Sequence, residues 1–185
     1  MRMKKIIGLV LALVMVLGIM PMGTIKAYAA EGDVAINETN FPDATFREYI
    51  KTKFDTDKNG TLSQQERNGV TKITVDKKQI ESLKGIEHFP KVWKIGCKNN
   101  KLRELDVRQN KDLEMLYCDH NNLVRLDLSQ NTALTDLNCS NNQLENLDVK
   151  ENTKLEKFWC SDNNLTKLEV SEKKLSTFWI AVPTN

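Results

Sequence analysis

Histidine is scarce in this sequence, with only His88 and His120 among its 185 residues. Neither histidine has a recognisable nucleophile or metal-ligand motif beside it, and the eight glycines form no glycine-rich phosphate loop. The acidic residues are scattered along the chain and do not gather in one motif. Because an active site needs acid, base and nucleophile groups that converge, the sequence predicts a protein that is not an enzyme.

Cysteine is also sparse, but its spacing is regular. The chain has four cysteines, and each lies 21 residues after the one before: Cys97, Cys118, Cys139 and Cys160. No C-x-x-C pair occurs, so the usual spacing of a zinc site is missing. A fixed period in the low twenties is typical of a solenoid, in which each repeat forms one coil and equivalent positions stack.

The first 29 residues differ in composition from the rest of the chain. The charged stub MRMKK precedes the apolar run IIGLVLALVMVLGIM, and Ala27-Tyr28-Ala29 has the small-x-small pattern of a cleavage site. This order predicts a secretory signal peptide over residues 1–29. The alternative is a membrane anchor, for which the apolar run is short. We therefore expect an extracellular protein, secreted or associated with a cell surface, whose mature chain has no membrane span.

Removal of this segment would change the sign of the net charge. The whole chain has 27 Lys and Arg against 25 Asp and Glu, and 23 of these basic residues lie after residue 29. The mature chain would therefore be slightly acidic. Its net charge gives no electrostatic reason to expect a nucleic-acid partner.

Leucines and asparagines repeat with the same period as the cysteines. The coils VWKIGCKNNKL (92–102), LEMLYCDHNNL (113–123), LTDLNCSNNQL (134–144) and LEKFWCSDNNL (155–165) follow the pattern of a leucine-rich repeat. An earlier coil at 70–80 has Val75 in the cysteine position, and a last partial coil has Ile180 there. The sequence thus predicts five coils and a partial coil over residues 70–185, after a cap at 30–69.

The repeat pattern also predicts which side chains face inward. Alternation around each cysteine predicts a short strand, and stacked strands form a parallel sheet on the concave face. A 21-residue coil leaves little room for a helix on the convex face, so we expect extended and turn structure there. The fold class is therefore an α/β repeat solenoid with a small helical cap.

The cysteines on this interpretation form an inward ladder. Two disulfides are the alternative in a secreted protein, but side chains on parallel neighbours run side by side and do not converge. We therefore expect buried thiols that behave as small hydrophobic groups. An asparagine lies three residues after each cysteine, and we expect its side chain to satisfy backbone groups in the turn. These residues are Asn100, Asn121, Asn142 and Asn163.

A twelve-residue segment before the coils, DTDKNGTLSQQE (55–66), fits the EF-hand pattern with Gly60 at its turn. The predicted ligands are Asp55, Asp57, Asn59, the Thr61 carbonyl, Ser63 through a water, and Glu66. Apolar residues at four-residue steps predict a preceding helix with Asp43 as its N-cap. The alternative is a surface turn of similar composition. EF-hands usually pair, so we expect a lone, weak and structural calcium site.

Two longer segments carry a family resemblance. FPDATFREYIK followed by IESLKGIEHFPKV resembles the N-terminal cap and first coil of the internalin family of Gram-positive surface proteins. The 21-residue repeats with a cysteine ladder resemble the internalin J branch. The resemblance implies a curved solenoid that binds other surfaces through its concave sheet, often as an adhesin, with a cap derived from an EF-hand.

Outward positions of the strands contain aromatic residues that are typical binding anchors. The predicted partner-binding residues are Tyr117, Trp159, Trp179, Met115 and His120. We interpret the chain as a secreted, adhesin-like module that recognises a protein or a glycan on another surface. Trp179 could instead cover the last coil. The alternative functions are a structural protein that self-associates through its apolar C-terminal coil, and a truncated family member.

Overall fold

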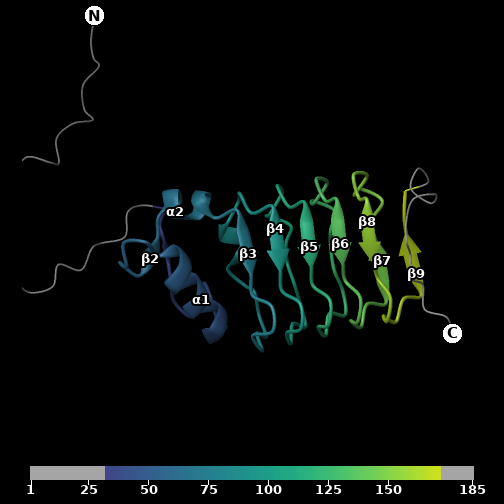
Figure 1. Cartoon of the computed structure of the whole chain (residues 1–185), viewed down its shortest axis with the longest axis horizontal. Helices are drawn as coiled ribbons and strands as arrows, with labels where there is room; N and C mark the ends of the chain where they lie inside the picture. Colours follow the sequence, from purple (N-terminus) through teal and green to yellow (C-terminus); the bar gives the residue numbers. More distant parts are fainter. Residues whose placement is uncertain (1–31, 172–185) are drawn as a thin grey trace, which may run out of the picture.

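A computed structural model of the chain describes residues 32–171. The predicted signal peptide and the partial coil that contains Trp179 and Ile180 lie outside these residues. Figure 1 shows a small helical cap followed by a row of coils stacked along one axis.

The cap comprises two helices and a short antiparallel pair of strands that α1 separates in the sequence. Its elements are β1 (Val34–Ala35), α1 (Ala44–Phe54), β2 (Thr61–Leu62) and α2 (Gln64–Gly69). Asp43 is the N-cap of α1, as the sequence predicts, because its Oδ1 accepts a hydrogen bond of 2.9 Å from the Phe46 amide. Phe46 and Ile50, one turn apart, are the buried residues of α1 and join the core at the open end of the first coil. Helix α1 lies beside the first strand of the coils (Figure 1).

One strand from each coil contributes to a five-stranded parallel sheet. Its strands in order are β3 (Lys72–Thr74), β4 (Lys94–Gly96), β5 (Met115–Tyr117), β6 (Asp136–Asn138) and β8 (Lys157–Trp159). Equivalent residues of successive coils are register partners, which is the alignment that the repeat spacing predicts. We call the outward surface of these five strands the sheet face.

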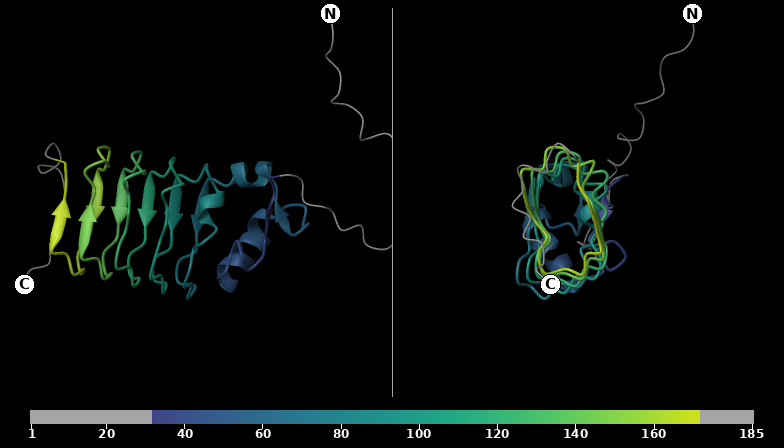
Figure 2. Two further views of the ribbon diagram at one scale, coloured as in Figure 1. Left: turned by 180° about the vertical axis from the view of Figure 1, so that it is seen from behind. Right: turned by 90° about the vertical axis from the view of Figure 1, so that its right-hand side faces the viewer.

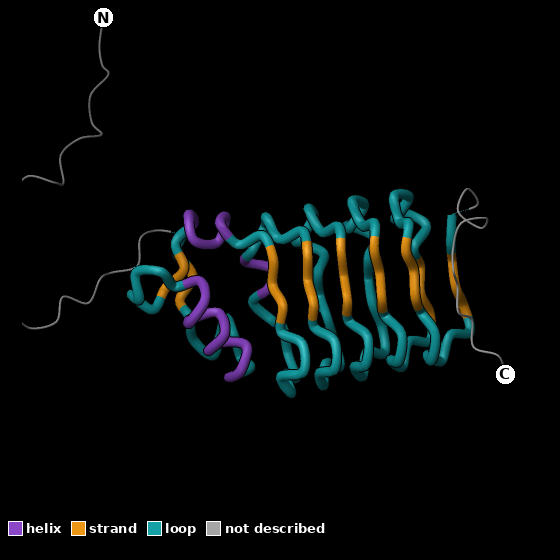
Figure 3. The backbone as a smooth tube through the Cα atoms, viewed as in Figure 1, coloured by secondary structure: helices purple, strands orange, loops and turns teal. Residues whose placement is uncertain are grey.

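The chain returns along the opposite face of each coil. There the structure has a 3₁₀ helix η1 (Ile86–His88) and a second parallel pair, β7 (Asn146–Asp148) with β9 (Lys167–Glu169). The remainder is turn and extended chain, as the coil length predicts (Figure 3). Viewed along the axis, the coils superimpose as a flattened ring (Figure 2).

The cysteine ladder is part of one continuous core. All four cysteines are free thiols, with relative exposures between 0% and 1%. Burial raises the pKa of each thiol, and it raises that of Cys160 to about 11. At neutral pH the cysteines are therefore protonated, apolar side chains that pack with the leucines.

The predicted turn asparagines tie neighbouring coils together. Asn121 donates from Nδ2 to the carbonyls of Cys97 and Cys118, both at 3.0 Å, and its Oδ1 accepts from the Leu102 amide at 3.0 Å. Asn100, Asn142 and Asn163 repeat this arrangement. Each side chain satisfies backbone groups that the turn would otherwise bury unpaired.

A second asparagine ladder, which the sequence analysis missed, lies on the other side of the core. It comprises Asn110, Asn131 and Asn152, whose relative exposures are 0%, 0% and 2%. Asn131 donates from Nδ2 to the carbonyls of Val107 (2.9 Å) and Asn110 (3.0 Å). The 21-residue spacing of these residues was the available signal, but they lie outside the pattern centred on the cysteines.

Candidate functional site

The loop between α1 and α2 gathers three of the predicted calcium ligands. Carboxylate oxygens of Asp55, Asp57 and Glu66 all lie within 4.8 Å of one another. Asp55 is 5% exposed and accepts hydrogen bonds of 3.0 Å from the amides of Asn59 and Gly60. Gly60 has φ +83°, a conformation that favours glycine and allows the tight turn. The local sequence therefore folds the chain around its own acidic side chains.

The other predicted ligands are held by hydrogen bonds within the loop. Asn59 Oδ1 accepts from both the amide and the hydroxyl of Thr61, each at 2.7 Å. Ser63 is the N-cap of α2 and forms a capping box with Glu66. These bonds fix the orientation of the side chains within the loop.

Glu66 is held in its ionised form by the same loop. Its Oε1 accepts from the Thr56 amide and hydroxyl at 2.7 Å, and its Oε2 accepts from the Ser63 amide and hydroxyl at 2.9 Å. Partial burial raises the pKa of Glu66, but these hydrogen bonds outweigh it and lower the pKa from 4.5 to about 2. Three carboxylates with hard oxygen donors fit the chemistry of calcium.

The loop has a strand partner that the sequence did not reveal. Strand β1 pairs antiparallel with β2, with Val34 opposite Leu62 and Ala35 opposite Thr61. The Ile36 amide also donates to the Gly60 carbonyl at 3.0 Å. A two-residue strand has no periodic pattern to detect, so the sequence did not predict this pairing. Strand β1 covers the free edge of the loop strand.

Two predicted partner-binding aromatics lie on the sheet face. Tyr117 on β5 and Trp159 on β8 are both register partners of Asn138 on β6. Trp159 is 37% exposed, and within residues 32–171 it is one of two exposed large hydrophobic side chains, the other being Val124. Met115 is half-buried, with its sulfur 4.0 Å from the Tyr117 hydroxyl. The structure thus brings Met115, Tyr117 and Trp159 onto one surface.

An acidic residue that the sequence analysis did not single out lies between these aromatics. Asp136 is 4% exposed and accepts from Lys157 Nζ at 2.9 Å and from Thr135 Oγ1 at 2.8 Å. Burial raises the pKa of Asp136, but the hydrogen bonds from Lys157 and Thr135 outweigh it and hold the pKa below 3.8. Its outward position on β6 was readable from the repeat, whereas its burial depends on the neighbouring side chains.

His120 lies at the rim of the sheet face. Its Nδ1 is 3.0 Å from Asp119 Oδ2, and its side chain is 53% exposed. The residue has φ +57° in the turn after β5, a conformation that Asn99, Asn141 and Asp162 share in other coils. His120 is therefore available to a partner as a polar group beside the aromatics.

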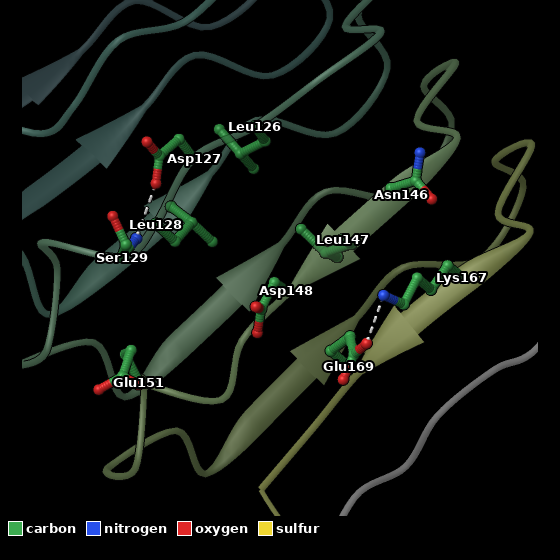
Figure 4. Close-up of a pocket in the computed structure, with 10 residues that line it drawn as sticks. All are labelled: Leu126, Asp127, Leu128, Ser129, Asn146, Leu147, Asp148, Glu151, Lys167 and Glu169. Carbon is green, nitrogen blue, oxygen red and sulfur yellow. Dashed lines mark hydrogen bonds and ion pairs between the residues drawn. The ribbon is translucent and has the colours of Figure 1, made fainter.

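A shallow groove of about 430 Å³ lies on the return face (Figure 4). Leucine side chains lie along it, and acidic side chains from successive coils point outward beside them (Figure 4). Glu169 is 2.7 Å from Lys167 Nζ and 3.0 Å from Lys150 Nζ. Asp127, Asp148 and Glu169 are bonded to basic or backbone partners, and the acidic groups of the groove do not converge on one point, so the groove lacks the arrangement of an active site.

No helix within residues 32–171 is long and apolar enough to cross a membrane. This finding is limited to the part of the chain that the structure describes.

Comparison with known proteins identifies a family and a fold. The family model of the endo-β-N-acetylglucosaminidase EndoS LRR domain matches residues 41–163. A comparison with curated proteins gives no match.

Two internalin structures from Listeria monocytogenes resemble the structure of this chain. The functional domain of InlJ, which includes a cysteine ladder, is 28% identical, has a TM-score of 0.60 and is matched over 75% of this chain. The internalin InlF is 19% identical, has a TM-score of 0.63 and is matched over 78% of this chain. This chain covers 35% of the InlJ chain and 41% of the InlF chain. The internalin-like leucine-rich-repeat fold and its cysteine ladder are thus confirmed.

Proposed function

The chain belongs to the family of the EndoS leucine-rich-repeat domain, and we propose that it acts as an extracellular binding module and not as an enzyme. The leucine-rich-repeat fold implies a protein-interaction module, because stacked coils create one extended binding surface. The likeness to the functional domain of InlJ supports the same class of function. We place the binding surface on the sheet face.

The exposed ring of Trp159 is the observation that carries this proposal. Large hydrophobic side chains are enriched among the anchors of binding surfaces, and an indole can stack on a sugar or fill a pocket in a protein. Tyr117 lies two strands away in the same outward row, with the Asn138 amide between them. The aromatics would supply buried contact area, while Asn138 and His120 would supply hydrogen bonds.

The partner on this proposal is a protein or a glycan on another cell or host surface. An adhesin-like role fits a chain with a predicted signal peptide, because an exported module meets such surfaces directly. The name of EndoS, an endo-β-N-acetylglucosaminidase, gives a reason to include N-acetylglucosamine glycans among the candidate ligands.

We also propose that calcium stabilises the cap. Asp55, Asp57 and Glu66 would hold the ion, with the Thr61 carbonyl and Asn59 completing the set. When bound, the ion would neutralise three neighbouring carboxylates. The loop would then be fixed against the first coil, since Leu62 within it is fully buried in the core. This role is structural, and it would support the sheet face without contacting the partner.

Binding of the labelled full chain to intact cells and to immobilised glycans would test the sheet face. We expect Trp159→Ala to lose most of the binding, because the substitution removes the exposed anchor. Val124→Ala is the matched control, since Val124 is 52% exposed but lies outside the five strands of the sheet. Equal binding by the wild type and Trp159→Ala would refute the sheet-face proposal.

A further inference from the structure

The coils nearest the cap differ in charge from the coils that follow. Residues 70–112 contain eleven Lys and Arg against six Asp and Glu, a net charge of +5. Residues 113–171 contain five Lys and Arg against ten Asp and Glu, a net charge of −5. The net charge of the whole chain is nearly balanced, but the first two coils, residues 70–112, are strongly basic.

The cations of the first two coils gather on the sheet face and on the turns that follow it. We call the following set the basic patch: Lys72, Lys77, Lys78, Lys94, Lys98, Lys101 and Arg103. Equivalent rows of the next three coils carry four acidic residues and one lysine: Asp119, Asp136, Glu145, Asp162 and Lys157. The same surface thus changes sign at the third coil.

Most of the charge in the basic patch is not neutralised by neighbours. Within residues 32–171, no carboxylate lies within 4.0 Å of the charged groups of Lys77, Lys78, Lys101 and Arg103, and all four residues are exposed. Lys98 is 3.9 Å from Asp76, the one close acidic partner in the patch. These charges remain available to a ligand.

The backbone around these side chains is fixed. Lys72 and Lys94 are register partners, so their strands lie ~4.8 Å apart. Asn100 Oδ1 accepts from the Lys78 amide at 3.0 Å, and the Lys101 amide donates to the Ile80 carbonyl at 2.8 Å. The turns that present the cations are therefore held in place before binding, which lowers the cost of ordering them.

We propose that the basic patch binds a linear sulfated polysaccharide. Such a chain gains affinity from the release of its condensed counterions and needs no apolar anchor. A folded protein partner usually needs one. Neither of the two exposed large hydrophobic side chains of residues 32–171, Val124 and Trp159, belongs to the patch. Sulfate and carboxylate groups follow one another closely along this polymer, which suits seven cations on two adjacent coils.

The position of the patch separates it from Trp159, although Lys94 Nζ lies over the ring of Tyr117, 5.3 Å from its centroid. Trp159 lies on β8, three strands beyond β4, in the coils whose net charge is negative. Those coils would repel a polyanion and confine it to the first two coils. The polysaccharide site therefore goes beyond the proposed sheet-face anchor, and either can fail without the other.

A heparin oligosaccharide is the probe for this site. We expect the full chain to bind it with an affinity that falls at least tenfold between about 50 and 200 mM salt. The variant Lys78→Glu/Lys101→Glu/Arg103→Glu should bind on the order of tenfold or more weakly at fixed salt, since three charged contacts are reversed. Titration calorimetry measures both effects.

The matched control changes the net charge equally but spares the patch. Lys84, Lys111 and Lys154 are exposed lysines outside it, and their triple substitution by glutamate should leave the affinity within about twofold of the wild type. An equal loss in both triple variants would show a net-charge effect and overturn the site. So would an unchanged affinity in the patch variant.

Two further measurements complete the test. Unchanged melting temperatures in both variants would show that the loss of binding is not a loss of folding. A desulfated heparin oligosaccharide of the same length keeps only its carboxylates and should bind at least about tenfold more weakly, and equal binding of the two oligosaccharides would overturn the assignment to a sulfated chain. Trp159→Ala should bind heparin like the wild type, which separates this site from the sheet-face proposal.

Discussion

The acidic side chains of the cap loop and the ladder asparagines of the coils form hydrogen bonds over different distances in the sequence. In the cap loop, Asp55 and Glu66 accept hydrogen bonds from residues at most ten positions away. In the coils, Asn121 and Asn131 reach carbonyls that are 24 residues away. The loop is therefore shaped by its own sequence, whereas each coil is shaped by its neighbour. Damage to the loop should stay local, and damage to a ladder should spread to adjacent coils.

Asn131→Ala should have the largest effect on stability. The substitution removes two buried hydrogen bonds between neighbouring coils, while the carbonyls of Val107 and Asn110 keep their backbone donors, the amides of Asn110 and Leu113. From the two lost bonds and the cavity that the amide leaves, we expect a loss of about 2–4 kcal/mol in the free energy of unfolding. Urea unfolding measures this loss. Asn122→Ala, a less buried asparagine in the same coil, should change stability by less than about 0.5 kcal/mol. Similar losses in the two variants would contradict the ladder's role.

Cys139→Ser should have the next largest effect. The thiol is fully buried, and its Sγ lies 3.5 Å from the Trp159 carbonyl, which already accepts from the Cys139 amide. A hydroxyl among the surrounding apolar side chains is expected to lower the free energy of unfolding by about 1–3 kcal/mol. Cys139→Val should be tolerated better, because Val75 occupies the same position of the first coil. Urea unfolding of both variants distinguishes an apolar role from a role that needs the thiol. A larger loss with valine than with serine would contradict the apolar interpretation.

The same contrast explains what the sequence could predict. The repeat spacing predicted the register of the coils, the inward cysteines and the turn asparagines. These predictions could be made because each position of the pattern recurs in several coils. The twelve-residue EF-hand pattern at 55–66 predicted the acidic loop, because the residues that shape this loop are close together in the sequence. Strand β1 was missed, because a two-residue strand has no period. The burial of Asp136 was missed as well, because Tyr117 and Lys157, which contact it together with the adjacent Thr135, lie on neighbouring coils.

Calcium should act on the cap alone. Millimolar calcium is expected to raise the free energy of unfolding of the wild type by about 1–2 kcal/mol if the ion is near ten times its Kd. Asp55→Ala should abolish this increase, whereas Glu38→Ala, an exposed acidic residue elsewhere in the cap, should retain it. Thermal melts with and without calcium measure the increase. Hydrogen exchange should slow at residues 55–66 and not at the ladder asparagines. Equal slowing throughout the coils would contradict a local effect.

Acid should weaken the loop before it affects the ladders. The pKa of Glu66 is lowered from 4.5 to about 2 in the folded chain, so ionised Glu66 stabilises the fold above pH 4.5. As the pH falls from 4.5 towards 2, the unfolded chain takes up this proton first and the stabilisation is lost. Glu66→Gln should therefore have a lower melting temperature than the wild type at neutral pH, and its melting temperature should decrease less below pH 4.5.

Glu48→Gln, on the exposed side of α1, should follow the wild-type pH profile. Because Asn121 and Asn131 carry no titratable group, hydrogen exchange at the ladders should respond less than exchange at the loop over this range. A parallel response in both regions would show that the cap and the coils unfold as one unit.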